Sequence, residues 1–304
     1  MTPEAFRAHA HRLIDLIADY RSSLPRRPVM ATTQPGAVKA LLPTQAPALP
    51  EPFAQVLADV ERIILPHLSH WQHPKFFAYF PSNAALASVL GDFLSTGLGV
   101  LGITWQTSPA LSELEEVTVD WMRQLLGLSP AWQGVIQDTA STATLVALLC
   151  ARERATDFAL ARDGLQATPA TLVMYASTQA HASVEKAAVL AGLGREQLRK
   201  VAVDESLSLC PQALEAAIQA DLAAGRRPCA VIVTTGTTAT TAVDPIEPIA
   251  ALARRYGLWL HVDAAMGGSA QLLPECRWMW EGIEGADSVV INPHKWLGAV
   301  FDCS

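Results

Sequence analysis

Cysteine is scarce in this sequence, and its spacing does not suit a metal or redox site. The 304 residues include five cysteines, and no two of them form a C-x-x-C pair. This spacing argues against a disulfide framework and against a zinc site built on cysteines. An odd number of cysteines in a chain of this length instead indicates reduced thiols in the core.

Charged residues are also few, and those present do not cluster by sign. They make up 17% of the chain, with 22 Lys and Arg against 29 Asp and Glu, so the formal net charge is −7. The basic pairs Arg26–Arg27 and Arg226–Arg227 are too short to form a patch. We therefore expect neither nucleic acid nor an anionic membrane as a partner.

Long apolar runs are absent as well. No stretch approaches the ~18 apolar residues of a membrane span. The residues from Met1 to Arg7 lack the basic-then-apolar pattern of a secretory signal. Half of the residues are nevertheless hydrophobic, which is enough for one large core or two domains. These features predict a globular, enzyme-sized protein of the cytoplasm.

The second half of the chain alternates apolar strands with helices. Strands are predicted at 171–176, 230–234, 258–262 and 288–291, and helices at 182–191, 213–222 and 249–256. This alternation is typical of a parallel sheet covered by helices. The sequence therefore predicts the α/β class.

The first half reads mainly as helices separated by a proline-rich segment. Helical spacing of apolar residues predicts helices at 4–20, 53–64, 88–96, 108–126 and 144–154. Seven prolines between residues 25 and 52 rule out long regular elements there and predict an extended arm. An isolated subunit would gain little from such an arm.

Two ionisable residues follow predicted strands directly. Asp263 ends the strand at 258–262, and Lys295 follows Asn292-Pro293, whose restricted backbone ends the last strand. Parallel strands deliver such residues to the crevice where open α/β sheets bind ligands. Pyridoxal phosphate requires this pair, a lysine for a Schiff base with its aldehyde and a carboxylate that keeps its pyridine nitrogen protonated. The ordinary alternative is a solvated turn lysine and a helix cap.

Small and hydroxylated residues precede the helix predicted at 144–154. They run from Thr139 through Ala140 and Ser141 to Ala143. A helix amino terminus with free N–H groups and nearby hydroxyls can bind a phosphate. Taken alone, the segment indicates only a helix cap.

The segments 261–265 (HVDAA) and 292–296 (NPHKW) resemble the signature of the group II pyridoxal-phosphate-dependent decarboxylases, and the whole chain resembles the aromatic-L-amino-acid decarboxylases among them. This resemblance implies a large domain of fold type I at 85–304, with a mainly parallel seven-stranded sheet. It also implies a helical and extended arm at 1–84 that packs over the second subunit of a homodimer. Relatives continue past residue 304 into a mobile loop and a small carboxyl-terminal domain, so we expect the chain to be truncated.

The resemblance also assigns roles to residues. Lys295 would carry the cofactor, Asp263 would pair with its ring nitrogen, and His181 would stack on its ring. Further cofactor contacts are implied for Ala140, Ser141, Thr238, Ala265, Asn292 and His294. The implied substrate pocket is formed by Trp71, Tyr79, Phe80, Pro81, Leu101 and Ile103. Relatives that act on bulky aromatic substrates often have Phe at the position of Ile103, so a wider pocket is expected here.

The function implied is decarboxylation of an aromatic L-amino acid to its amine and carbon dioxide. Aminotransferases and desulfurases of the same fold also have a lysine and an aspartate, and other group II decarboxylases act on glutamate or histidine. A glutamate pocket would need cationic walls, whereas the segment at 71–82 offers only Lys75 and histidines. An inactive fragment that binds pyridoxal phosphate is a further alternative.

Two other motifs are weaker. His67, His70 and His73 are spaced by three residues, but the outer two diverge around a helix and no carboxylate or cysteine joins them, so no metal is expected. The segment 97–102 fits G-x-G-x-x-G. It follows a predicted helix rather than a strand, which argues against a dinucleotide site.

Overall fold

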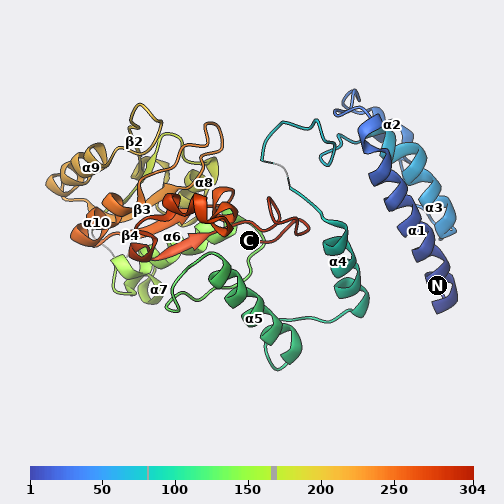
Figure 1. Ribbon diagram of the computed structural model, residues 1–304, viewed down its shortest axis with the longest axis horizontal. Coiled ribbons are helices and arrows are strands. Elements are labelled where there is room, and N and C mark those ends of the chain that lie inside the picture. The colour runs from blue at the N-terminus through green and yellow to red at the C-terminus, as the bar shows by residue number, and fades with distance from the viewer. Residues whose placement is uncertain (81, 166–169) are drawn as a thin grey trace. The chain divides into compact units, whose positions relative to one another are not determined.

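The computed structural model describes residues 1–80, 82–165 and 170–304, and the chain divides into two compact units, Met1–Pro81 and Ser82–Ser304 (Figure 1). Each unit is described by itself. Among the described residues, no helix is both long enough and apolar enough to cross a membrane.

The first unit consists of helices joined by irregular chain. Its helices are α1 (Pro3–Ser23), α2 (Ala37–Leu41) and α3 (Phe53–Asp59), and α3 continues into the π-helical turn Val60–Ile64. The side chain of Thr2 caps α1 by accepting the N–H of Ala5 at 3.2 Å, and Pro3 takes the first helical position, where its missing donor costs nothing. The predicted helices at 4–20 and 53–64 are confirmed.

The three histidines spaced at 67, 70 and 73 each have a different hydrogen-bond partner. His70 bonds to the hydroxyl of Tyr20 at 2.9 Å, and His67 bonds to that of Thr33 at 2.8 Å. The Nδ1 of His73 accepts the N–H of Lys75 at 2.9 Å. Within the described chain, no group of three His, Cys, Asp or Glu side chains could hold a metal ion. The structure thus gives these histidines local structural roles.

The second unit opens with two helices, α4 (Leu86–Leu98) and α5 (Pro109–Leu125). Gly99 ends α4 with φ +63°, a left-handed conformation that glycine adopts without steric cost. The G-x-G-x-x-G segment therefore lies at a helix carboxyl terminus and not between a strand and a helix. The prediction that this segment follows a helix rather than a strand is confirmed.

A parallel sheet forms the centre of the second unit. Its strands are β1 (Leu172–Ser177), β2 (Leu198–Val201), β3 (Arg227–Thr234), β4 (Trp259–Asp263) and β5 (Ser288–Val290). They run in the order β2-β1-β3-β4-β5, and every neighbouring pair is parallel. The α/β class is confirmed. The expected number of seven strands is wrong, since the described chain forms five; that number came from the resemblance and not from strand patterns in this sequence.

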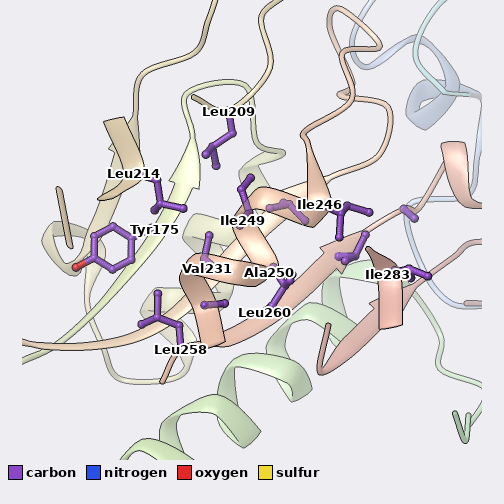
Figure 2. Packing of buried hydrophobic residues seen from close by; sticks show 14 of the residues in the cluster. Tyr175, Leu209, Leu214, Val231, Ile246, Ile249, Ala250, Leu258, Leu260 and Ile283 are labelled. Carbon is purple, nitrogen blue, oxygen red and sulfur yellow. The ribbon is translucent and has the colours of Figure 1, made fainter. Parts of the chain in front are cut away.

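Helices cover both faces of the sheet (Figure 1). They are α6 (Ala140–Ala155), α7 (Ala159–Asp163), α8 (Ala182–Leu190), α9 (Pro211–Ala223) and α10 (Ile246–Tyr256). Alternate residues of β1 serve the two faces, because successive strand side chains point to opposite sides. Tyr175 packs with Ile249 of α10 and Leu260 of β4 in one core (Figure 2), whereas Met174 packs with Leu148 of α6 in the other.

A buried carboxylate ties α9 to the strands beside it. Asp221, which is 3% exposed, accepts hydrogen bonds from the hydroxyl of Tyr175 at 2.9 Å and from Arg199 and Arg226, each at 2.8 Å. Burial alone would raise the pKa of Asp221, but these three donors outweigh it and hold the pKa below its ordinary value. The network joins α9, β1, β2 and the turn that precedes β3.

We expect Asp221→Ala to lower the free energy of unfolding by about 3 kcal/mol at pH 7, because two guanidinium groups lose their buried partner. A carboxyl with a lowered folded pKa stabilises the protein above its unfolded pKa, and that contribution is lost as the pH falls through the folded value. The difference between wild type and variant in urea unfolding should therefore shrink below about pH 4. Glu205→Ala, at an exposed carboxylate, is the control; a pH-independent difference for Asp221→Ala would contradict the expectation.

Candidate functional site

Four neighbouring strands end at one edge of the sheet, and each leads into residues expected in the site. The sheet order places β1, β3, β4 and β5 side by side and parallel. His181 follows β1, Thr238 follows β3, Asp263 ends β4, and Asn292, His294 and Lys295 follow β5. Because carboxyl ends of parallel strands share one edge, the fold gathers these residues on one side of the sheet.

Asp263 and Lys295 come from adjacent strands and interact electrostatically. The carboxylate of Asp263 is 5% exposed and accepts the N–H of Ala265 at 3.1 Å, which fixes the turn after β4. Burial lowers the pKa of the Lys295 amine below its ordinary value, and the negative charge of Asp263 offsets part of that effect. The site therefore contains an amine that loses its proton more readily than a solvated lysine does.

The turn that carries Lys295 is held by a segment near the start of the second unit. The side-chain amide of Asn83 donates to the carbonyl of Lys295, and the backbone N–H of Asn83 donates to the carbonyl of His294 at 2.7 Å. Ala85 donates to the carbonyl of Gly298 at 2.8 Å. These bonds fix the backbone on both sides of Lys295. The position of its amine then varies only through the flexibility of the lysine side chain.

Asn292 and His294 lie beside the lysine, and both are buried. The amide nitrogen of Asn292 is 3.3 Å from Nε2 of His294, and Nδ1 of His294 accepts the N–H of Cys303 at 3.0 Å. Burial lowers the pKa of His294, and the charge of Lys295 lowers it further. A neutral imidazole next to Lys295 does not repel a proton on that amine.

Helix α6 presents its amino terminus with Ala140 buried and Ser141 exposed. The side chain of its N-cap residue, Thr139, makes no capping bond, so that side chain leaves the N–H groups of the first turn uncapped. Asp138 precedes it and accepts the N–H of Thr139 at 2.7 Å. Ala140 and Ser141 thus occupy the helix end at which a phosphate would bind.

The turn after β3 is closed by its own hydrogen bonds. Thr237 is fully buried, its N–H donates to the carbonyl of Ala242 at 2.9 Å, and its hydroxyl lies 2.7 Å from that of Thr240. Thr238 is exposed on this turn. Its hydroxyl is therefore open to a ligand, whereas that of Thr237 is committed to the turn.

His181 is the N-cap of α8. Its Nδ1 accepts the N–H of Ser183 at 3.2 Å and lies 2.8 Å from the hydroxyl of Ser183. These bonds fix the plane of the ring, while the residue stays exposed. An imidazole oriented in this way can lie flat against another ring.

The residues expected in the substrate pocket belong to both units. In the first unit, Trp71 stacks on Tyr79 with centroids 5.6 Å apart, and Phe80 is half-buried. In the second unit, Leu101 and Ile103 are 68% and 76% exposed. Pro81 lies outside the described residues. The assignment of these six residues to one pocket stays a prediction.

Two residues with contacts to the candidate site were not singled out from the sequence. Asn83 holds the Lys295 turn across 212 positions of chain, and no local pattern signals such a contact. His261 lies two residues before Asp263 on β4, and the side-chain period of a strand places both on one face. That alternation is a signal from which His261 could have been found.

The chemistry of this edge fits pyridoxal phosphate. Lys295 provides an amine for its aldehyde, Asp263 a carboxylate for its ring nitrogen, and α6 a helix amino terminus for its phosphate. The buried hydroxyls of Thr234 and Thr235, at the end of β3, have no hydrogen-bond partner within the described chain. Polar atoms at this edge thus remain able to bond to a bound group.

Comparison with known proteins agrees with this geometry. Residues 35–304 match the pyridoxal-dependent decarboxylase conserved domain. The chain is 43% identical to phenylacetaldehyde synthase of Arabidopsis thaliana and 42% identical to aromatic-L-amino-acid decarboxylase of Bos taurus, in each case over 100% of its own length. It spans 63% and 64% of those two proteins, respectively.

The solved structures agree in fold. The crystal structure of Catharanthus roseus tryptophan decarboxylase in complex with L-tryptophan matches with a TM-score of 0.94 and 39% identity, over 100% of this chain and 64% of that one. Together with the match at residues 35–304, this similarity shows that the chain belongs to the pyridoxal-dependent decarboxylase family.

Proposed function

We propose that the protein decarboxylates an aromatic L-amino acid to the corresponding amine and carbon dioxide, with pyridoxal 5′-phosphate as cofactor. The observation that carries this proposal is the electrostatic pair formed by buried Asp263, at the end of β4, and half-buried Lys295, in the turn after the adjacent strand β5. Relatives over 40% identical include aromatic-L-amino-acid decarboxylase and tryptophan decarboxylase, which supports an aromatic substrate.

The cofactor, when bound, supplies an aldehyde that condenses with an amine and a ring that withdraws electrons from the carbon losing its carboxylate. Lys295 would present its amine to that aldehyde, in a turn fixed by Asn83. Asp263 would hold a proton on the ring nitrogen, because a carboxylate beside a pyridine favours the protonated ring. The exposed ring of His181 would cover the cofactor and limit its contact with water.

Aromatic side chains favour an aromatic substrate over an acidic one. Trp71 and Tyr79 present flat, stacked surfaces in the first unit. Ile103, in the second, is smaller than an aromatic residue and would leave room for a large ring. An apolar wall cannot compensate for the desolvation of a second carboxylate, so a glutamate side chain is disfavoured.

The substrate class is tested by incubating the protein and pyridoxal phosphate with DOPA, 5-hydroxytryptophan, histidine and glutamate separately. Carbon dioxide, amine and aldehyde are measured together, so that an aldehyde-forming reaction is recognised. We expect catalytic efficiency on an aromatic substrate to exceed that on glutamate by at least about a hundred-fold, the scale on which an unpaired buried polar group discriminates. Glutamate as the best substrate would overturn the pocket assignment, and a protein that binds pyridoxal phosphate without releasing carbon dioxide would support the inactive alternative.

We also propose a homodimer, with the exposed apolar faces of α4 and α5 in the contact and the arm at 1–84 packing over the second subunit. Leu90, Leu94 and Leu98 on α4 are 57%, 62% and 66% exposed, and Trp121 on α5 is 59% exposed. Neither helix has a buried residue within this single chain. Apolar faces of this extent mark association sites. A cytoplasmic location is proposed as well, since all five cysteines are free.

A charged residue in this face should break the dimer. We expect Leu94→Glu to shift the protein from dimer to monomer in sedimentation velocity at micromolar concentration, because it buries a carboxylate without a partner. Leu190→Glu, at a 72% exposed leucine on α8, is the matched control and should leave the mass unchanged. A wild type that sediments as a monomer would refute the proposed assembly.

A further inference from the structure

On β4, two residues before Asp263, the second unit contains a group of hydrogen-bonded polar side chains around His261. The proposed chemistry does not use this group. His261 is 1% exposed and is the register partner of Ser288 on β5. Its Nδ1 lies 2.9 Å from the hydroxyl of Ser288, and that hydroxyl also accepts the indole N–H of Trp259 at 2.8 Å. Nε2 of His261 lies 3.4 Å from the hydroxyl of Thr144. One imidazole thus links three elements, β4, β5 and α6.

These links connect the two ends of the candidate cofactor site. Thr144 lies in the second turn of α6, whose first turn is the expected phosphate end, and it is fully buried. His261 and Asp263 lie on the same face of β4, one pleat apart. A change in the His261–Thr144 contact would therefore move the carboxylate relative to the helix end that faces the phosphate.

His261 is also neutral, so it does not neutralise the charge of the Asp263 carboxylate. Ser and Thr hydroxyls can each donate or accept, so both ring nitrogens are satisfied by a neutral imidazole. Burial lowers the pKa of His261 to about 4, although the nearby charge of Asp263 and a hydrogen bond to Ser288 oppose this shift. A neutral ring does not form an ion pair with the carboxylate, which remains free for the ring nitrogen of the cofactor.

We propose that His261 is a positioning residue for Asp263, which it holds at a fixed distance from the amino terminus of α6 through Ser288 and Thr144. The proposal rests on the proposed function, since it takes Asp263 as the partner of the cofactor's ring nitrogen. It adds a residue that contacts neither the cofactor nor the substrate and acts only through the carboxylate.

The test measures cofactor binding rather than turnover. Cofactor-free wild type and His261→Phe are titrated with pyridoxal phosphate and, separately, with an analogue that has carbon in place of the ring nitrogen, by quenching of tryptophan fluorescence. We expect His261→Phe to weaken binding of pyridoxal phosphate by about ten-fold or more, the loss seen when the support of a ligand-holding side chain is removed. Binding of the analogue should be nearly unchanged, because the analogue has no nitrogen for Asp263 to contact.

Two further variants separate positioning from general stability. Ser288→Ala removes one hydrogen-bond partner of His261 with a smaller change of volume, and it should also weaken binding of pyridoxal phosphate. This variant keeps the proposal testable if His261→Phe fails to fold. Tyr175→Phe removes a buried hydrogen bond from β1, at Asp221, and should lower thermal stability without changing either affinity. In an Asp263→Asn background, His261→Phe should have no further effect on binding, because residues that act through one another are not additive.

The outcomes separate the two proposals. Equal weakening for pyridoxal phosphate and the analogue, or full additivity with Asp263→Asn, would overturn the role of His261 and leave the proposed function standing. A wild-type protein that binds neither compound would overturn the proposed function and this inference with it.

Discussion

Lys295→Ala is expected to remove the visible absorbance of bound pyridoxal phosphate and to lower amine formation by at least about a thousand-fold, the scale on which loss of a nucleophile is felt. The physical reason is that Lys295 is half-buried, that burial lowers the pKa of its amine, and that it lies at the same edge of the sheet as Asp263. No other lysine follows a strand of the described sheet in this way. The measurement is an absorbance spectrum of the reconstituted protein together with single-turnover product analysis.

Lys186→Ala is the matched control, since this lysine is exposed on α8. It should leave both the spectrum and the product unchanged. An absorbance band that survives in Lys295→Ala would show that another amine binds the aldehyde, and the assignment of Lys295 would fail. If product were also lost while the band survived, Lys295 would act in a later step and not as the amine that binds the aldehyde.

Asp263→Asn is expected to lower the decarboxylation rate by roughly a hundred-fold or more, a loss on the scale of other charge-stabilising groups. The amide oxygen of Asn can still accept the N–H of Ala265, so the turn after β4 should persist. The change therefore removes the negative charge with little change of shape. Without that charge the ring nitrogen loses the partner that favours its protonated form, and the ring withdraws electrons less well.

The rate of Asp263→Asn is compared with that of Asp263→Ala at saturating cofactor. Similar losses in both variants would assign the effect to the charge, and a much larger loss in Asp263→Ala would assign part of it to the turn. A rate near that of the wild type in Asp263→Asn would contradict the pairing of this carboxylate with the ring nitrogen.

Local patterns in the sequence were sufficient for most of the second unit. The strands that lead to Asp263 and Lys295 are short apolar runs followed by turn-forming residues, and they were predicted to within a residue or two. Strand β2 was missed because its centre is Arg199-Lys200. It lies at the edge of the sheet, where Arg199 forms an ion pair with Asp221 and does not pack in a hydrophobic core. An edge strand of four residues has no continuous apolar run by which it could be recognised.

The surroundings of the site were harder to predict than its reactive residues. Lys295 and Asp263 could be proposed because each follows a strand, and one edge of a parallel sheet gathers such residues. The Asn83–Lys295 contact joins residues 212 positions apart, and only the tertiary arrangement determines it. Helix α6 also begins at Ala140 rather than at residue 144, since its start is set by the extended backbone of Thr139 and not by apolar spacing.

The contact between Thr144 and His261 has a consequence for how the chain is synthesised and folds. It joins residues 117 positions apart, so α6 leaves the ribosome well before β4 and β5 exist to receive it. Until then α6 can pack only on the strands that are synthesised before β4, which are β1, β2 and β3. The loop that must close afterwards is long, which slows folding. Cofactor that binds only the completed edge would draw the late strands into place by mass action. The nascent protein is therefore most exposed to aggregation in the interval before residue 295 has been added.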